Sequence, residues 1–324
     1  MKKVLVVGGG GFIGSHIVDL LLKKKVKVIV IDNLDKQVHK VYPSYLNDKA
    51  KYYFCNVGSS SLDYEKILDG VDSIFYAGCK VGPVQSMKDI NQFISVNLGE
   101  LGYFLEQLLK YGKSVKRIIN SGSMAGYVSE VIKPFDENTK VTPKSYYGLT
   151  KETQENMFSL FAKTYDKEFV SLRYFSVYGT RQALYNPMAG PVPTWITLAL
   201  KNKDLIINED GQQTRDFINV KDIADLNYKF ASMRLKNQVD IINCGTGVST
   251  KILDIVTLIK SLVGSKSKII INNRRFKGDL RHSLCDNTKL KNYVPNLHFV
   301  ALNEGLKEEI KWIRKELGRY SDFH

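Results

Sequence analysis

The chain has 324 residues, of which 44% are hydrophobic and 25% are charged. This composition is typical of a soluble globular protein, and the length exceeds what one hydrophobic core usually serves, so we expect two lobes. No apolar run reaches the ~18–20 residues that a membrane span needs, and the N-terminus is typical of a strand rather than of a cleavable signal. These features exclude a membrane-spanning class and predict a cytoplasmic protein.

The net charge of +14, from 47 basic and 33 acidic residues, allows two interpretations. One is nucleic-acid binding, and the other is a lysine-rich surface that helps to attract a small anionic substrate. The longest basic run is only Lys23–Lys25, and no nucleic-acid-binding motif is present. The pattern therefore favours the second interpretation, and we expect no nucleic-acid partner.

Cysteine and histidine spacing predicts neither a metal site nor a disulfide framework. No C-x-x-C pair occurs, and the histidines lack metal-ligand spacing. The residues concerned are Cys55, Cys79, Cys244, Cys285, His16, His39, His282, His298 and His324. We expect the thiols to be reduced and the histidines to be structural or at the surface.

Short segments rich in β-branched residues alternate with helical segments in the first half of the chain. The expected strands are 3–7, 26–31, 51–55, 73–76, 117–120 and 169–173. The expected helices are 12–24, 61–69, 90–111 and 148–165. This alternation predicts an α/β fold with a Rossmann-type doubly wound parallel sheet.

The rhythm changes after about residue 175, where prolines cluster at Pro187, Pro191 and Pro193. Shorter helical and strand pieces follow, at 194–202, 205–208, 220–232 and 251–263. We predict a dinucleotide-binding domain over 1–175 and a smaller α/β substrate-binding lobe formed mostly by 176–324, with some segments that return to the first domain. The second lobe would cover the carboxyl edge of the sheet, where such folds bind ligands.

Three glycines follow the first expected strand in the pattern G-x-x-G-x-x-G, at Gly8, Gly11 and Gly14. Gly8 and Gly11 permit a tight turn and let a pyrophosphate approach the backbone, while Gly14 lets the next helix pack closely on the sheet. The phosphates would then face the unpaired N–H groups at the start of that helix. The segment predicts dinucleotide binding.

An acidic residue, Asp32, ends the second expected strand, eighteen residues after Gly14. A carboxylate at this place accepts hydrogen bonds from the adenosine ribose and repels a 2′-phosphate. No arginine adjoins it, so NAD is favoured over NADP. The alternative, a glycine turn that serves packing alone, explains neither Asp32 nor the run of four glycines.

A catalytic group is predicted in SYYGLTK, where Tyr147 and Lys151 are four residues apart at the start of a helix and share one face. An ammonium near a phenol favours the phenolate and lowers the pKa of the tyrosine. The phenolate then takes a proton from a sugar hydroxyl while hydride leaves the same carbon. Ser123 ends a strand at the carboxyl edge and is placed to hydrogen-bond the reacting oxygen. A surface Tyr-x-x-x-Lys is the alternative, which the order of the other motifs disfavours.

These motifs resemble those of the extended short-chain dehydrogenase/reductase family, the nucleotide-sugar epimerases and dehydratases. The resemblance covers nearly the whole chain, and is carried by GGGGFIGSH, VIDNLD, VNLGEL, YGLTK, LRYFSVYGTRQ, DGQQTRDFINVKDIA, NCGTG and KGDLRHSLCD. It implies tightly held NAD, a nucleotide-diphosphate-sugar substrate, and a homodimer whose four-helix bundle is formed by 90–111 and 148–165.

The resemblance also implies roles for individual residues. The catalytic residues would be Ser123, Tyr147 and Lys151. Those that bind the cofactor would be Gly8, Gly11, Phe12, Ile13, Gly14, Asp32, Asn33, Asn56, Val57, Ala77, Gly78, Lys80, Asn97, Tyr147, Lys151 and Tyr174. Those that bind the substrate would be Ser123, Met124, Ser176, Arg215 and Arg281. Ser176 stands where many relatives have an asparagine that contacts the sugar nucleotide, a departure within the sugar pocket.

The reaction is narrowed by the residues that follow Ser123. Relatives that eliminate water carry an acidic pair there, and decarboxylating relatives usually keep a glutamate, whereas this chain has Met124 and Ala125. What remains needs only hydride and proton transfer at one carbon. A 4-epimerase does this twice, and an NAD(P)H-dependent 4-ketoreductase of a dTDP-4-keto-6-deoxy sugar does it once.

Two features favour the epimerase. YAGCK resembles the A-G-x-K segment of UDP-galactose 4-epimerases, and Asp32 implies NAD, whereas biosynthetic reductases more often use NADPH. DNLDKQVHK, PSYLN, VGPVQSM and RQALYNPMAG resemble the dTDP-L-rhamnose 4-epimerase branch, with UDP-hexose 4-epimerases as near neighbours. A third class, a non-catalytic dinucleotide sensor, is disfavoured because Tyr147 and Lys151 are both present.

Two arginines in the second lobe, Arg215 in QQTRDF and Arg281 in GDLRHS, match family residues that hold the substrate diphosphate. The planar guanidinium suits phosphate because it makes paired, charge-assisted hydrogen bonds. The alternative is a surface arginine or an ion pair, for instance of Arg215 with Asp216. Trp195 and Trp312, in helical segments with apolar neighbours, are expected to serve packing.

Overall fold

The computed structural model describes the chain except for residues 128–132, 185, 187–189, 278–279 and 322–324. Pro187, His324 and parts of the segments RQALYNPMAG and KGDLRHS therefore lie outside the described residues. No helix in the described part of the chain is long and apolar enough to cross a bilayer.

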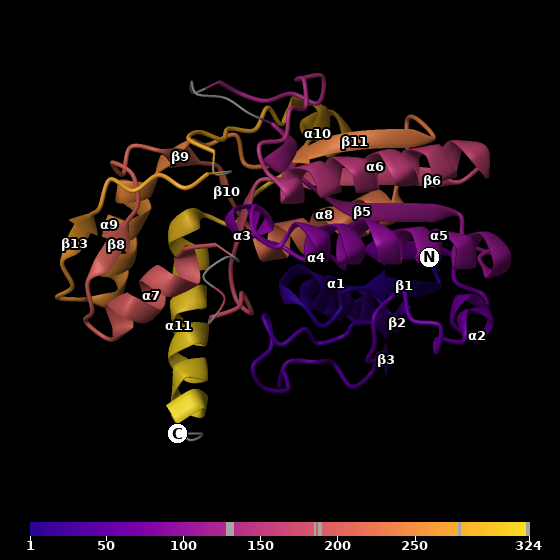
Figure 1. The fold of residues 1–324 in the computed structure, drawn as a ribbon, viewed down its shortest axis with the longest axis horizontal. Coiled ribbons are helices and arrows are strands. Elements are labelled where there is room, and N and C mark those ends of the chain that lie inside the picture. The colour runs from indigo at the N-terminus through magenta and orange to yellow at the C-terminus, as the bar shows by residue number, and fades with distance from the viewer. Residues whose placement is uncertain (128–132, 185, 187–189, 278–279, 322–324) are drawn as a thin grey trace.

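A seven-stranded parallel sheet forms the centre of the larger lobe (Figure 1). In spatial order its strands are β11 (Val239–Cys244), β6 (Glu168–Tyr174), β5 (Arg117–Ser123), β4 (Ser73–Tyr76), β1 (Lys3–Val7), β2 (Lys27–Ile31) and β3 (Lys51–Tyr53). β1 and β2 are buried on both faces, which is why KVLVV and KVIVI are nearly continuous apolar runs. The predicted Rossmann-type doubly wound sheet is confirmed.

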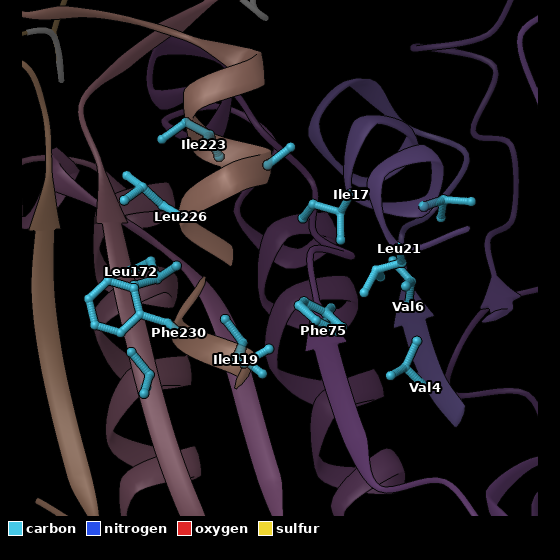
Figure 2. Close-up of a cluster of buried hydrophobic side chains, with 14 of the residues drawn as sticks. Val4, Val6, Ile17, Leu21, Phe75, Ile119, Leu172, Ile223, Leu226 and Phe230 are labelled. Atoms are coloured by element: carbon cyan, nitrogen blue, oxygen red, sulfur yellow. The ribbon is translucent and has the colours of Figure 1, made fainter. Parts of the chain in front are cut away.

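Helices cover both faces of this sheet. On one face lie α1 (Phe12–Lys23) and α8 (Val220–Ser232), and on the other α2 (Tyr64–Leu68), α5 (Glu100–Tyr111) and α6 (Tyr146–Thr164). Figure 2 shows the first core layer, where Ile17 and Leu21 of α1 and Leu226 and Phe230 of α8 pack on strand residues such as Phe75. Each such buried side chain contributes about 1.5–3 kcal/mol of transfer free energy, so the layer holds the strand ends in place.

The second lobe lies beyond the carboxyl end of the large sheet (Figure 1). Its helices are α7 (Val192–Leu200), α9 (Ile252–Val263) and α11 (Leu302–Ser321), which share an apolar core. Its short strands are β7 (Ser176–Tyr178), β8 (Leu205–Ile207), β9 (Thr214–Arg215), β10 (Phe217–Asn219), β12 (Thr250–Lys251) and β13 (Ile269–Ile271). Trp195 and Trp312 pack in this core, as expected. In chain order, α8 and β11 interrupt the second lobe: α8 packs on the large sheet, and β11 is one of its strands.

The helix expected over 90–111 is present and contains a π-helical turn. It consists of α4 (Ile90–Ile94), a π-helical turn over Ser95–Gly99, and α5. Asn97, in the wide turn, is fully buried, and its side-chain amide donates to the backbone carbonyl of Lys80 and the hydroxyl of Thr150. The turn is thus tied to two other segments, a contact that helical periodicity alone does not reveal.

A buried carboxyl group lies where α11 meets the segment after β7. Glu309 is fully buried, and neither of its carboxyl oxygens has a hydrogen-bond partner among the residues that the structure describes. Burial raises the pKa of Glu309 to about 8; the nearby backbone N–H of Gly179 lowers it only in part and does not reach hydrogen-bond geometry. A buried carboxyl without partners is stable only as the neutral acid.

We therefore expect Glu309 to make the protein less stable as pH rises. The folded-state pKa lies above the ordinary value of 4.5, so the free energy of unfolding falls between about pH 4.5 and 8 and is then constant in this contribution. Glu309→Gln keeps the shape without the charge and is expected to raise the melting temperature at pH 9 but not at pH 4. Glu308→Gln, at an exposed position of the same helix, is the control. Equal pH dependence of wild type and Glu309→Gln would contradict this prediction.

Candidate active site

The glycine loop is shaped by its own backbone. Gly8 has a φ of +77°, and a Cβ at this residue would lie 2.6 Å from the backbone nitrogen of Gly78. A Cβ at Gly14 would lie 2.0 Å from the carbonyl oxygen of Gly8, whereas one at Gly11 would meet that oxygen at an ordinary 3.5 Å. The packing of the loop therefore requires glycine at residues 8 and 14. At Gly11 the loop itself leaves room for a side chain, so we attribute the glycine there to a ligand that approaches the backbone.

The start of α1 leaves room for an anion. Gly11 caps the helix without a side chain that could bind the first N–H groups, which are unpaired at any helix start. Gly11, Phe12, Ile13 and Gly14 all line one cavity of the molecule. An uncapped helix N-terminus that faces a cavity is the arrangement that binds phosphate.

Asp32 lies at the same cavity, at the carboxyl end of β2. Its two oxygens accept hydrogen bonds from the backbone N–H groups of Gly10 and Leu34, both at 2.8 Å. Each carboxylate oxygen has a second lone pair, so Asp32 is held in place and still able to accept from a ribose diol. The glycine cradle and this carboxylate together fit NAD.

The cavity collects most of the predicted cofactor residues. Those that line it are Gly8, Gly11, Phe12, Ile13, Gly14, Asp32, Asn33, Asn56, Val57, Ala77, Gly78, Lys80, Tyr147 and Tyr174, together with Ser123. The sequence reasoning missed further lining residues, among them Gln37, His39, Cys55, Cys79, Glu100, Ser121, Gln182 and Asn186. Cys79 lies between the predicted residues Gly78 and Lys80, and Ser121 lies two residues before Ser123 on β5, so nearness in the sequence was a usable signal.

Ser123 and Tyr147 meet at the edge of this cavity. Ser123 is the last residue of β5, and Tyr147 lies in the first turn of α6, which Ser145 caps by accepting from the N–H of Gly148 at 3.1 Å. The backbone N–H of Tyr147 donates to the hydroxyl of Ser86 at 3.0 Å. Strand end and helix start thus fix the two hydroxyl groups near each other.

The pKa of Tyr147 is raised, not lowered. Burial is the main cause and Cys79 adds to it, while a hydrogen bond with Ser123 lowers the pKa in part. Lys151 is not among the groups that shift the pKa of Tyr147 in the chain by itself, and its ammonium donates to the side-chain oxygen of Gln154 at 2.7 Å. Lys151 Nζ also lies 3.8 Å from Cys79 Sγ.

Six predicted residues do not line the cavity: Asn97, Lys151, Met124, Ser176, Arg215 and Arg281. The side chain of Asn97 is held by Lys80 and Thr150, and its backbone carbonyl accepts from Gln154 at 2.8 Å. Its contact with the cofactor stays a prediction. Lys151 lies just behind the wall, where it lines a small void with Ser123 and Glu155.

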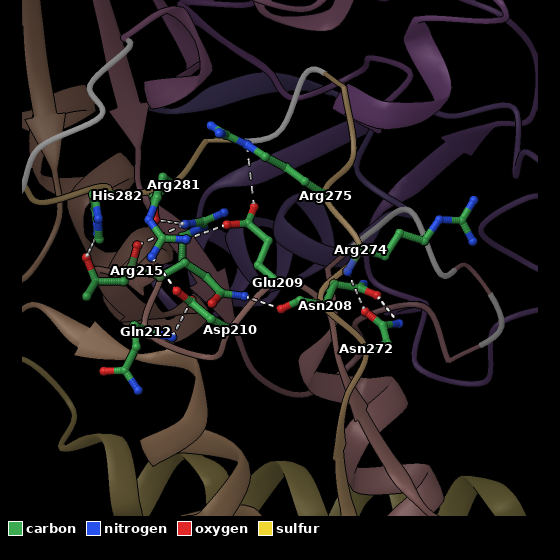
Figure 3. A network of polar contacts seen from close by, with 12 residues as sticks. Asn208, Glu209, Asp210, Gln212, Arg215, Asn272, Arg274, Arg275, Arg281 and His282 are labelled. Carbon is green, nitrogen blue, oxygen red and sulfur yellow. Dashed lines mark hydrogen bonds and ion pairs between the residues drawn. The ribbon is translucent and has the colours of Figure 1, made fainter.

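The two arginines of the second lobe lie together but are already engaged (Figure 3). Arg281 donates through Nη1 to Glu209 at 2.8 Å and through Nη2 to Asp210 at 2.7 Å. Arg215 donates to the backbone carbonyl of Arg281 at 3.1 Å. A guanidinium has five N–H donors, so the ion pairs of Arg281 leave donors for a further anion.

Asp216, the suggested partner of Arg215, has another task. Its carboxylate accepts from the backbone N–H groups of Thr246 and Gly247, both at 2.8 Å, and from that of Cys285 at 3.1 Å. These hydrogen bonds hold the NCGTG loop against the residue that follows β9. No group of three side chains that could hold a metal ion occurs among the residues described.

The sheet order, the glycine cradle with Asp32, and the Ser123–Tyr147 pair define a dinucleotide-dependent enzyme of the short-chain dehydrogenase/reductase type. The sequence model described as "NAD dependent epimerase/dehydratase family" matches residues 4–245. The chain belongs to this family, and its cofactor is NAD.

Relatives and solved structures agree. The chain is 32% identical to a putative UDP-glucose 4-epimerase of Methanocaldococcus jannaschii, over 96% of this chain and 98% of that one. It is 28% identical to the dTDP-L-rhamnose 4-epimerase of Burkholderia thailandensis, over 98% and 96%. A UDP-glucose 4-epimerase of Thermotoga maritima, solved with UDP-glucose, superposes with a TM-score of 0.88 at 31% identity, over 98% of this chain and 100% of that one.

Proposed function

We propose that the protein is an NAD-dependent 4-epimerase of a nucleotide-diphosphate hexose, either a dTDP-6-deoxyhexose or a UDP-hexose. The observation that carries this proposal is the Ser123–Tyr147 pair at the edge of the dinucleotide cavity, followed by Met124 and Ala125 in place of acidic residues. NAD, when bound, supplies the acceptor and the donor of hydride at carbon 4. The relatives named above, a putative UDP-glucose 4-epimerase and a dTDP-L-rhamnose 4-epimerase, support the proposal.

In this mechanism Tyr147 takes the proton from the carbon-4 hydroxyl. It returns the proton to the same oxygen after the 4-keto sugar has rotated in the site to present its other face. Ser123 hydrogen-bonds the same oxygen and holds it in place. Because burial raises the pKa of the Tyr147 phenol, its loss of a proton requires positive charge nearby, and Lys151, one helical turn along α6, supplies it. Met124 and Ala125 carry no proton donor, which leaves elimination of water without an acid.

The direct test is incubation of the purified holoenzyme with UDP-glucose, UDP-galactose, dTDP-glucose and a dTDP-6-deoxyhexose, without added NADH. Proton NMR of the anomeric region is expected to show conversion of at least one of them to its carbon-4 epimer. If none gives an epimer, and a dTDP-4-keto-6-deoxy sugar instead consumes NAD(P)H, the 4-ketoreductase is the correct function.

Arg281 is proposed to bind the substrate diphosphate, together with Arg215. Arg281→Gln is expected to raise the KM for the sugar nucleotide by about 10–100-fold with little change in kcat, because hydrogen bonds to charged groups contribute about 1.5–3 kcal/mol. Arg274→Gln, at an exposed residue near the same turn, is the matched control. A KM that is equal in wild type and Arg281→Gln would remove Arg281 from the phosphate site.

We also propose a homodimer whose four-helix bundle is formed by α4–α5 and α6 of both copies. Large apolar side chains are exposed on these helices at Ile94, Leu109, Leu149 and Leu160, and Leu160 is 69% exposed. Leu160→Glu is expected to give a monomer in light scattering coupled to gel filtration, because a buried unpaired charge opposes association. Ile206→Glu, at an exposed apolar residue of the second lobe, is expected to stay dimeric. A dimeric Leu160→Glu protein would place the interface elsewhere.

A further inference from the structure

The ammonium of Lys151 is held by the side chain of Gln154. Lys151 is 3% exposed, and its Nζ donates to Oε1 of Gln154 at 2.7 Å. Gln154 is fully buried, and its Nε2 donates in turn to the backbone carbonyl of Asn97 at 2.8 Å. One amide group therefore bridges the catalytic helix α6 and the turn before α5.

The far end of this bridge is rigid. The carbonyl that Gln154 contacts belongs to the π-helical turn Ser95–Gly99, and such turns are rare and often lie at functional sites. Asn97 is itself anchored, since its Oδ1 accepts from the N–H of Lys80 at 2.7 Å and its Nδ2 donates to Thr150 at 2.9 Å. Gln154 thus has no freedom to rotate without leaving a buried donor or acceptor unpaired.

The near end of the bridge lies at the wall of the cavity that Tyr147 lines. Lys151 Nζ lies 3.8 Å from Cys79 Sγ, and Cys79 lines the cavity beside Tyr147. An amide oxygen is a suitable holder for this ammonium because it accepts a hydrogen bond without cancelling the positive charge. A carboxylate at residue 154 would neutralise that charge, and an apolar side chain would leave it unheld.

We propose that Gln154 is a positioning residue for Lys151, which fixes the ammonium beside the cavity wall so that its charge acts on the Tyr147 phenol. The role in the reaction rests on the proposed function, in which Tyr147 must lose its proton. The position of the ammonium does not, and it is measured separately.

The first experiment is the pH profile of kcat/KM for the holoenzyme. Activity falls on the acid side as Tyr147 takes up a proton, and removal of a nearby positive charge makes proton loss harder. Gln154→Leu and the isosteric Gln154→Glu are both expected to move the acid limb to higher pH by about one unit or more. Lys163→Gln, which removes one charge at an exposed position of α6, is expected to leave the limb unchanged.

The second experiment is the rate of acetylation of Lys151 by acetic anhydride, followed by peptide mass spectrometry on NAD-free protein. Release from the amide is expected to increase this rate several-fold in Gln154→Leu relative to wild type, with surface lysines as internal references. Thermal melts show whether Gln154→Leu folds. If it does not, the pH profile of Gln154→Glu, which replaces only the amide nitrogen by oxygen, tests the proposal.

The outcomes separate the two proposals. An acid limb that does not move in a folded Gln154 variant, even with reduced kcat, indicates a merely structural role and overturns the inference. An unchanged acetylation rate in folded Gln154→Leu overturns it as well. If the wild type epimerises no sugar nucleotide, the proposed function fails, and the acetylation rate alone decides whether Gln154 holds Lys151.

Discussion

Tyr147→Phe is expected to lower kcat by about 10²–10⁴-fold, the usual contribution of a positioned acid–base group. The hydroxyl is the only part removed, and it is the part that hydrogen-bonds with Ser123 at the cavity edge. The ring, which packs against Phe93, stays in place. The affinity for NAD, measured by calorimetry on NAD-free protein, is therefore expected to change little.

The matched control for this variant is Tyr146→Phe. Tyr146 precedes the catalytic residue on the same helix and does not line the cavity, so loss of its hydroxyl is expected to leave kcat within about twofold of wild type. Retained turnover in Tyr147→Phe would show that another group moves the proton. A loss of NAD binding together with turnover would show instead that the hydroxyl has a structural role.

Gly14→Ala is expected to destroy dinucleotide binding and to lower the stability of the protein. The added Cβ would lie 2.0 Å from the carbonyl oxygen of Gly8, a backbone atom that cannot move without opening the loop. Overpacking of this kind costs about 1–3 kcal/mol or more, and the loop that faces the phosphates would be displaced. Thermal melts and calorimetry with NAD measure the two effects.

Alanine substitutions at two other glycines distinguish an effect on stability from an effect on NAD binding. Gly11→Ala meets only an ordinary 3.5 Å contact, so it is expected to keep the melting temperature but to weaken NAD binding, because its Cβ would point to the cavity. Gly318→Ala lies in α11, where an added Cβ would meet no described atom within 4 Å outside its own helix turn, so it is expected to be neutral or slightly stabilising. Normal NAD affinity in Gly14→Ala would contradict the proposed close approach of helix and loop.

The order of strands and helices could be predicted from the sequence because each depends on residues close together in the chain. Runs such as KVLVV and KVIVI belong to strands buried on both faces, and the glycine pattern with Asp32 depends on one turn and the next strand end. The placement of Ser123 at the cavity follows from the same rule, since carboxyl ends of parallel strands share an edge, and Tyr147 joins it from the start of α6.

The tertiary structure alone decided what the long polar side chains contact. The ammonium of Lys151 is held by Gln154, and Asn97 anchors a π-helical turn and does not line the cavity. Arg281 is paired with Glu209 and Asp210, and the buried carboxyl of Glu309 finds no hydrogen-bond partner in the described part of the chain. The local pattern of the chain determined the sheet, the glycine cradle and the site of chemistry. The partners of these polar groups depend on which distant segments pack together, and periodicity and spacing do not carry that information.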